Sequence, residues 1–319
     1  MPLPTGPTIG ILADNLRLRR SVLPLSRKSA MRWSAGLGLP RGGETVLYTG
    51  LMYQLIPYIA AMSGFQEKIE NSFLAGFIGL GRRTNRLVNI SAPMAMPGAA
   101  TKERYNRVLR DIAGLLSAAG VEFGYLYADE LYSGALIYDL GVDDLFEGHA
   151  RRVYDTFRKY GVKNVITVDP HTTNMLRSVY PSLLKGYDLK VQSYLEVLAA
   201  RGLRPVRELA ADVVLHDSCV YARYENVLAP QRTLLTRAGL TVREPRGAGK
   251  FTHCCGGPAE SLFPQKAKKV ARRRVDQLKE AGGHGVTMCP ICLVNLQKAA
   301  GPELDLQDIS GYLAQAYGG

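Results

Sequence analysis

The sequence predicts an α/β protein with largely parallel sheets, arranged as two similar halves in tandem. Three observations support this: short apolar segments alternate with amphipathic ones, segments of the first half recur in the second, and all five cysteines lie in the last third of the 319 residues. Alternating strands and helices are typical of βαβ units, whose strands pair in parallel.

The expected strands are short apolar runs that precede amphipathic segments. They are VLYTG (46–50), VNISA (88–92), FGYLY (123–127), NVITV (164–168), DVVLHD (212–217), LTVRE (240–244) and GVTM (285–288). Residues 102–120, 147–161 and 193–202 have apolar side chains at helical spacing, so we expect helices there.

Composition indicates a folded protein with a positive surface. Hydrophobic residues make up 46% of the chain, and 40 Lys and Arg against 28 Asp and Glu give a net charge of +12, which attracts anionic partners. Basic residues concentrate in 15–33 and 265–281. The second stretch is interpreted as a solvated helix face or a docking site for an acidic protein. No nucleic-acid module accompanies the charge, so we expect no nucleic-acid partner.

The N-terminus lacks the basic start and apolar run of a secretory signal. No stretch reaches the roughly 18 to 20 apolar residues that span a bilayer. We therefore expect a cytoplasmic protein without a transmembrane segment.

The cysteine spacing points to a metal centre. Cys219, Cys254, Cys255, Cys289 and Cys292 form the pattern C-x34-CC-x33-C-x2-C. An odd count without a secretory signal argues against a disulfide framework. A zinc site is closed by four ligands and leaves one cysteine over, whereas an iron–sulfur cluster can use more thiolates. Structural zinc and inert buried thiols remain the alternatives.

The segments that carry these cysteines are expected to converge. VLHDSC and GVTMC each end a predicted strand with a cysteine, and the carboxyl ends of parallel strands share one sheet edge. Between Cys254 and Cys255 an extended backbone would send the side chains to opposite faces. Gly256 and Gly257 allow the chain to turn there and leave backbone N–H groups free to approach sulfur.

The "CCGGP" and "CPICL" boxes, in the pattern C-x34-CC-x33-C-x2-C, resemble the cysteine-rich CCG domain of the heterodisulfide reductase B/D-subunit family. The resemblance covers most of the chain, and it extends to iron–sulfur subunits of glycolate and lactate oxidases and of some succinate dehydrogenases. It implies that the five cysteines bind one non-cubane [4Fe-4S] cluster beside Gly256. His216 and His253 are then candidates to supply protons to a thiolate product, although a hydrogen-bonding role is the simpler interpretation of each.

Members of this family typically carry two CCG domains in tandem, and a first copy without cysteines is recognisable. VLYTGLMY (46–53) aligns with VLHDSCVY (214–221), ELYSGALIYDLG (130–141) stands where the CCG box belongs, and VITVDPHTTNML (165–176) aligns with GVTMCPICLVNL (285–296). Leu51, Tyr132, Ser133, Asp169 and Thr172 then occupy cysteine positions. The fold prediction becomes two pseudo-symmetric Rossmann-like half-domains.

The first copy is interpreted as a retained folding scaffold. Alternatively, it is a remodelled substrate or partner pocket lined by Tyr132, Ser133, Asp169 and His171. His171 by itself is read as a hydrogen-bonded loop histidine.

Three segments follow from this alignment: a basic N-terminal arm (1–44), a degenerate CCG-like domain (45–204) and an intact CCG domain (205–319). The first copy carries an insertion that includes GFIGLGRR (76–83), which fits no phosphate-binding spacing and is read as a loop. The arm resembles the linker that follows a ferredoxin-like domain in longer members. Because no C-x2-C-x2-C-x3-C-P run occurs, we expect electrons to arrive from a separate ferredoxin-like subunit.

Three functions are consistent with these features. The first is a heterodisulfide-reductase-like oxidoreductase subunit that reduces or forms a disulfide or related small sulfur substrate within a complex. The second is an electron relay between a flavoprotein subunit and a quinone or carrier. The third is a structural subunit that binds zinc. An accessible pocket beside the cluster favours the first, and an enclosed cluster near another redox centre favours the second.

Overall fold

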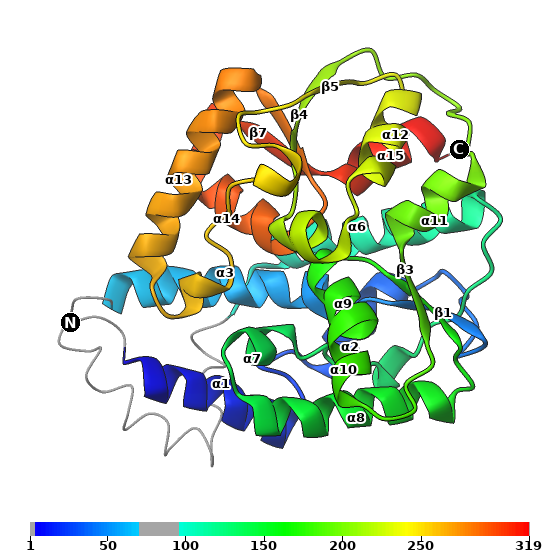
Figure 1. Cartoon of the computed structure of the whole chain (residues 1–319), viewed down its shortest axis with the longest axis vertical. Helices are drawn as coiled ribbons and strands as arrows, with labels where there is room; N and C mark the ends of the chain where they lie inside the picture. Colours follow the sequence, from blue (N-terminus) through cyan, green and yellow to red (C-terminus); the bar gives the residue numbers. More distant parts are fainter. Residues whose placement is uncertain (1–3, 70–95, 319) are drawn as a thin grey trace.

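The computed structural model describes residues 4–69 and 96–318 and contains two sheets, one in each half of the molecule (Figure 1). The first has the order β1-β2-β3, from β1 (Thr45–Tyr48), β2 (Asn164–Thr167) and β3 (Lys190–Ser193). The second has the order β5-β4-β6-β7, from β4 (Asp212–His216), β5 (Thr241–Arg243), β6 (His284–Thr287) and β7 (Asp305–Asp308). All pairs within both sheets are parallel, so the predicted fold class is confirmed.

The two sheets repeat one pattern. Val46 pairs with Val165 in the first sheet, and Val214 pairs with Gly285 in the second, which matches the alignment of 46–53 with 214–221 and of 165–176 with 285–296. An isolated parallel bridge joins Val46 to Gly124, on the side of β1 that corresponds to the place of β5 beside β4. The recurrence in the sequence thus reappears in the strand pairing.

Helices surround both sheets. The first half contains α1 (Thr5–Arg19), α2 (Arg27–Met31), η1 (Arg32–Ser34), α3 (Met52–Ile69), α6 (Ala99–Ala118), η3 (Tyr127–Asp129), α7 (Ala135–Asp139), α8 (Asp143–Lys159), α9 (Pro170–Asn174), the π-helix η4 (Met175–Val179), α10 (Tyr180–Leu183) and α11 (Tyr194–Arg201). The second contains the π-helix η5 (Tyr221–Glu225), α12 (Ala229–Arg237), η6 (Gly249–Phe251), η7 (Pro258–Ser261), α13 (Pro264–Ala281), α14 (Pro290–Ala300), η8 (Gly301–Glu303) and α15 (Ile309–Tyr317).

Local sequence explains the long helices. In α8, Phe146, Ala150, Val153 and Phe157 recur at helical spacing and are buried, so they form the apolar stripe of an amphipathic helix. Acidic residues occupy its first turn and basic residues its last turn, where each charge is stabilised by the helix dipole.

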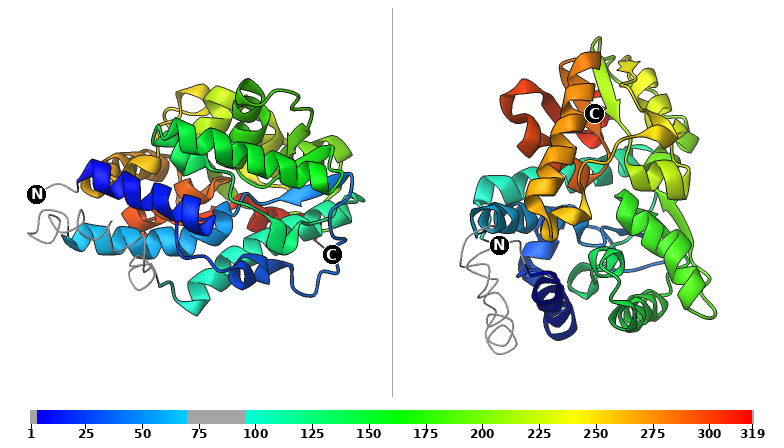
Figure 2. Two further views of the ribbon diagram at one scale, coloured as in Figure 1. Left: turned by 90° about the horizontal axis from the view of Figure 1, so that it is seen from below. Right: turned by 60° about the vertical axis from the view of Figure 1, so that its left-hand side comes forward.

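Helices α3 and α6 belong to the first half in sequence but run between the two halves (Figures 1 and 2). Helix α3 packs against α13 and α14 of the second half, and α6 packs against α15. Apolar burial is continuous across this junction. The segment that carries the CCG box therefore faces side chains of the first half.

The N-terminal arm is helical and packed over much of its length. Leu16 of α1 and Trp33 of η1 are buried, and the indole Nε1 of Trp33 donates a hydrogen bond of 3.2 Å to the hydroxyl of Tyr125. Arg17 keeps 56% of its side chain exposed. The arm thus combines a buried apolar side with an exposed basic one.

Among the described residues, one expected strand differs from the structure and two strands were not expected. Residues 123–127 form isolated bridges that lead into η3, and β3 and β7 are the strands that the sequence did not predict. Both have alternating burial and polar sequences, KVQS and DLQD, which lack the apolar run that predicts a strand. VNISA and GFIGLGRR lie outside the described residues. Among the helices that the structure describes, none is long and apolar enough to cross a membrane.

Candidate metal centre

The five cysteines lie at one edge of the second sheet. Cys219 follows β4, Cys289 directly follows β6 and is the N-cap residue of α14, and Cys292 lies in the first turn of that helix. Strands β4 and β6 are parallel neighbours, so their carboxyl ends bring these cysteines together. Cys254 and Cys255 lie in the loop between η6 and η7, which follows β5 on the other side of β4. The expected convergence of three segments is observed.

The thiols form one contiguous group. Neighbouring thiols shift one another's pKa, Cys219 with Cys254, Cys254 with Cys255, Cys255 with Cys292 and Cys292 with Cys289. All five are free. Neighbouring thiols lower the pKa of Cys254, and although burial raises the pKa of Cys289, interactions with Cys292 and His171 outweigh it and lower the pKa. A lowered thiol pKa favours the thiolate form that binds a metal.

The turn after the adjacent cysteines depends on Gly256. Its φ of +87° is in the left-handed region, and a Cβ there would lie 2.5 Å from the carbonyl oxygen of Ala267, so a larger residue would not fit. Its backbone N–H donates to the Sγ of Cys254 at 3.4 Å. The glycine at the aligned position, Gly134, has a similar φ of +83°.

Asp217 fixes the loops around Cys219 and Cys254. Its carboxylate is buried and accepts two hydrogen bonds from Arg232, of 2.8 and 2.7 Å, and one of 2.7 Å from the N–H of Gly249. Its carbonyl accepts a bond of 2.9 Å from the hydroxyl of Thr252. Although burial raises the pKa of Asp217, the hydrogen bonds from Arg232 and Gly249 outweigh this effect and lower the pKa. The carboxylate therefore stays ionised, and its charge-assisted hydrogen bonds hold both loops in place.

The two candidate histidines lie in different environments. His216 is fully buried, and one of its ring nitrogens lies within 4.8 Å of the sulfurs of Cys255 and Cys292. Burial, reinforced by Arg274, lowers its pKa to about 3, so the ring is neutral. His253 is exposed, and its Nδ1 lies 3.2 Å from the amide nitrogen of Gln277. Of these two candidate histidines, only His216 therefore belongs to the buried centre.

A histidine of the cysteine-free half also reaches the centre. His171, in α9, interacts with Cys289, and its Nδ1 lies 3.8 Å from the carboxylate of Asp139. Burial lowers its pKa, but the interactions with Cys289, Asp139 and Asp169 outweigh this effect and raise the pKa to about 9. This contact is not apparent from the sequence, because it forms between two helix N-termini in different halves.

Two of the other residues aligned with cysteines have structural partners. Asp169 caps α9 by accepting a hydrogen bond of 3.0 Å from the N–H of Thr172, just as Cys289 occupies the N-cap of α14. The hydroxyl of Tyr132 accepts a bond of 2.9 Å from the N–H of Leu136. Asp169 and Tyr132 thus maintain the frame of the first half, whereas the hydroxyl of Ser133 is buried without a hydrogen-bond partner among the described residues.

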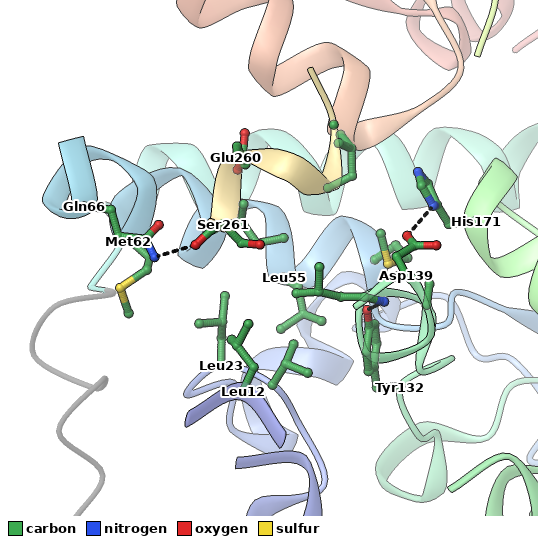
Figure 3. A pocket seen from close by; sticks show the side chains of 17 residues that line it. Leu12, Leu23, Leu55, Met62, Gln66, Tyr132, Asp139, His171, Glu260 and Ser261 are labelled. Atoms are coloured by element: carbon green, nitrogen blue, oxygen red, sulfur yellow. Dashed lines mark hydrogen bonds and ion pairs between the residues drawn. The ribbon is translucent and has the colours of Figure 1, made fainter. Parts of the chain in front are cut away.

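An apolar pocket opens beside the centre, between the two halves (Figure 3). Its lining includes Gly257, Ile291 and His171 as well as Leu12 and Leu55. Tyr132 and His171 are among the expected pocket residues that line it, whereas Ser133 and Asp169 are not. A Cβ placed on Gly257 would lie 3.8 Å from the Sγ of Cys255, so the lining reaches the cysteines.

The pocket is small. Its volume is about 70 Å³, about half that of an apolar cavity of about 150 Å³ that binds benzene. A single ring can therefore enter only if side chains of the lining move apart.

The donor set fits an iron–sulfur cluster. Five free thiols exceed the four ligands of a zinc site. Cys255 and Cys292 lie beside the buried His216, which accepts a hydrogen bond from the buried Arg274. A family model described as "Cysteine-rich domain" (CCG) matches residues 213–297. This part of the chain is a CCG cysteine-rich domain. The match spans all five cysteines and confirms the resemblance that their spacing suggested.

Three curated relatives are similar to this chain. "EtfAB:quinone oxidoreductase" of Syntrophomonas wolfei is 34% identical and aligns with 60% of this chain and 28% of its own length. "Probable iron-sulfur-binding oxidoreductase FadF" of Bacillus subtilis is 29% identical, with 67% and 32% aligned. "Probable membrane-anchored ferredoxin" of Chromohalobacter salexigens is 29% identical, with 62% and 31% aligned.

The chain thus spans about a third of the length of these relatives. The first two are named oxidoreductases, the second is also named iron-sulfur-binding, and the third is named a ferredoxin. Among solved structures, an aspartate racemase homologue from Pyrococcus horikoshii aligns with 84% of this chain at 12% identity and a TM-score of 0.27, which carries no functional argument.

Proposed function

We propose that this chain is the iron–sulfur module of an oxidoreductase complex, in which Cys219, Cys254, Cys255, Cys289 and Cys292 hold one non-cubane [4Fe-4S] cluster. The observation that carries the proposal is the convergence of all five free thiols at one edge of the second sheet. The cluster would supply one-electron chemistry when bound, and the protein's side chains provide the shielding and the substrate pocket.

The apolar pocket supports a lipophilic redox partner of the quinone class. Its lining is almost entirely hydrocarbon and includes His171, which interacts with Cys289. A quinone ring would pack against Leu55 and Ile291 and place a carbonyl near the imidazole. The name of one relative, "EtfAB:quinone oxidoreductase", supports the same substrate class, and a flavoprotein and a ferredoxin-like unit are then the partners that supply electrons.

A disulfide substrate is the second candidate. The position of the pocket directly beside the cysteines favours direct reaction at the centre, as the heterodisulfide reductase resemblance implies. A small, uncharged disulfide would enter the same pocket. An anionic one would lose hydration in this mainly apolar lining and would meet the acidic side chains of Glu260 and Asp139.

The first test is the metal content of anaerobically purified protein. About four irons and four sulfides per chain support the cluster, whereas zinc without sulfide overturns it and leaves a structural subunit. EPR spectra recorded with a soluble quinone analogue and, separately, with a small neutral disulfide then distinguish the two substrates. The proposal of a quinone requires the spectrum or the reoxidation rate to respond to the analogue.

A further inference from the structure

Arg274 is a fully buried cation that the helix pattern alone does not reveal. It lies in α13 beside Arg273, which is exposed, but its own side chain has no accessible surface. Nη1 donates to the carbonyls of Arg246 and Gly247, at 2.8 and 3.1 Å, and to Gln277 at 3.0 Å. Within the part of the chain that the structure describes, Nη2 has no hydrogen-bond partner.

This cation has no carboxylate in an ion pair among the described residues. The nearby acid, Asp217, is engaged by Arg232. Moving a charge out of water costs several kcal/mol unless a compensating charge lies close. Asp217, Cys292 and Glu244, in this order, act on Arg274 electrostatically, so a negatively charged cluster at Cys292 would add compensating charge beside the guanidinium.

Arg274 also determines which nitrogen of His216 carries hydrogen. Its Nε donates to the Nδ1 of His216 at 3.0 Å. Guanidinium groups only donate, so Nδ1 must be the acceptor and the hydrogen of the neutral ring resides on Nε2. Nε2 is buried and has no hydrogen-bond partner among the described residues, although His216 lies against Cys255 and Cys292.

A nitrogen that carries hydrogen has no lone pair for a metal. His216, Cys255 and Cys292 have the spacing of a metal site, but with Nδ1 occupied by Arg274 the ring is a donor at Nε2. Hydrogen bonds from N–H groups to the sulfurs are one of the ways in which a protein tunes the potential of an iron–sulfur cluster.

We propose that His216 donates an N–H···S hydrogen bond to the cluster, and that Arg274 acts as the positioning residue that fixes this tautomer and adds a buried positive charge. This inference rests on the proposed cluster. Both groups stabilise the more reduced, more negative state, so together they raise the reduction potential. Neither group is a ligand.

The test is an EPR-monitored redox titration of the intact protein and of variants with unchanged iron and sulfide. Arg274→Gln and His216→Phe are each expected to lower the midpoint potential. At a fixed applied potential the ratio of reduced to oxidised cluster should fall about tenfold, which corresponds to a shift of about 59 mV for one electron. Arg273→Gln, which removes the same charge from the exposed neighbouring position, is the matched control and should leave the potential unchanged.

Two further, more conservative variants keep the test possible if Arg274→Gln or His216→Phe does not fold. His216→Gln retains an amide N–H and should recover much of the potential. Arg274→Lys keeps the charge but lacks the planar donor, so its shift should fall between those of wild type and Arg274→Gln. Equal potentials in all variants that retain the cluster overturn the inference while the proposed function stands.

The strength of the magnetic coupling between the cluster and a histidine nitrogen distinguishes a hydrogen-bond donor from a metal ligand. With ¹⁵N-labelled histidine, pulsed EPR should show weak couplings, of which His216→Phe removes one and leaves that of His171, beside Cys289. A strong coupling of the kind given by a directly ligated imidazole would overturn the donor role. If the purified protein holds no iron and sulfide, the proposed function itself fails. This result is distinct from a failed redox titration or a strong nitrogen coupling, which would overturn only the role of His216 and Arg274.

Discussion

Tyr53 and Tyr221 occupy equivalent positions in the two halves, and each donates a hydrogen bond to the N-cap residue of a helix in the opposite half. Tyr53 donates to the carboxylate of Asp308, the N-cap of α15, at 2.6 Å. Tyr221 donates to the hydroxyl of Ser193, the N-cap of α11, at 2.8 Å. The halves are therefore connected by a reciprocal pair of buried bonds.

We predict that Tyr53→Phe lowers the free energy of unfolding by about 1.5 to 3 kcal/mol, because it removes a bond to a buried carboxylate. Tyr221→Phe, which removes a bond to a neutral hydroxyl, should cost about 1 kcal/mol. Denaturant unfolding measures both. Tyr224→Phe, at a position that is 70% exposed, is the control. If the three substitutions lowered the free energy of unfolding equally, the two buried hydrogen bonds would not connect the halves as described.

Glu130 is expected to make stability depend on pH. Although Tyr125 and Thr49 donate hydrogen bonds to it, burial dominates and raises its pKa to about 7. A folded-state pKa above the unfolded one means that the contribution is complete below about pH 4.5 and is lost as pH rises through about 7.

The free energy of unfolding of wild type, relative to Glu130→Gln, should thus decrease by up to about 3 kcal/mol between about pH 4.5 and pH 8. Urea denaturation of both proteins across this range is the measurement. The exposed Glu122→Gln variant should show no such trend. A constant difference between wild type and Glu130→Gln would mean that Glu130 has the same pKa in both states.

Replacement of cysteines should show that the second half, and not the first, binds the iron. Cys255→Ser and Cys292→Ser are expected to lose most of the iron, since a hydroxyl is a poor substitute for a thiolate. Ser133→Ala, at the position aligned with Cys255, should retain it. Iron and sulfide analysis after anaerobic purification is the measurement. Iron loss in Ser133→Ala would indicate that the first half also binds metal.

Filling the pocket should impair substrate turnover without affecting the cluster. Leu136 lines the pocket, so Leu136→Trp is expected to reduce kcat/KM for a soluble quinone by about tenfold, about 1.4 kcal/mol of transition-state binding. Leu183→Trp, at a position that is 38% exposed and outside the lining, is the control. Unchanged turnover with an intact cluster would place the substrate elsewhere.

Much of the architecture was predictable from short-range patterns. The strands β1, β2, β4 and β6 are apolar runs, and α6, α8 and α11 have helical apolar spacing. The strands β3 and β7 were missed because their polar sequences alternate in burial. The pocket was only partly foreseen, since its lining comes from α1, α3, α7 and η7, which are far apart in the sequence.

The sequence by itself determined the parallel α/β class and the five candidate ligands, because strand periodicity and cysteine spacing are local properties. The tertiary structure alone decided that His171 contacts Cys289, and that Arg274 rather than Arg273 is buried against His216. These contacts join segments from different halves or different faces of the sheet. Which side chains meet there depends on how the helices pack, and that packing is not encoded in any single stretch of the chain.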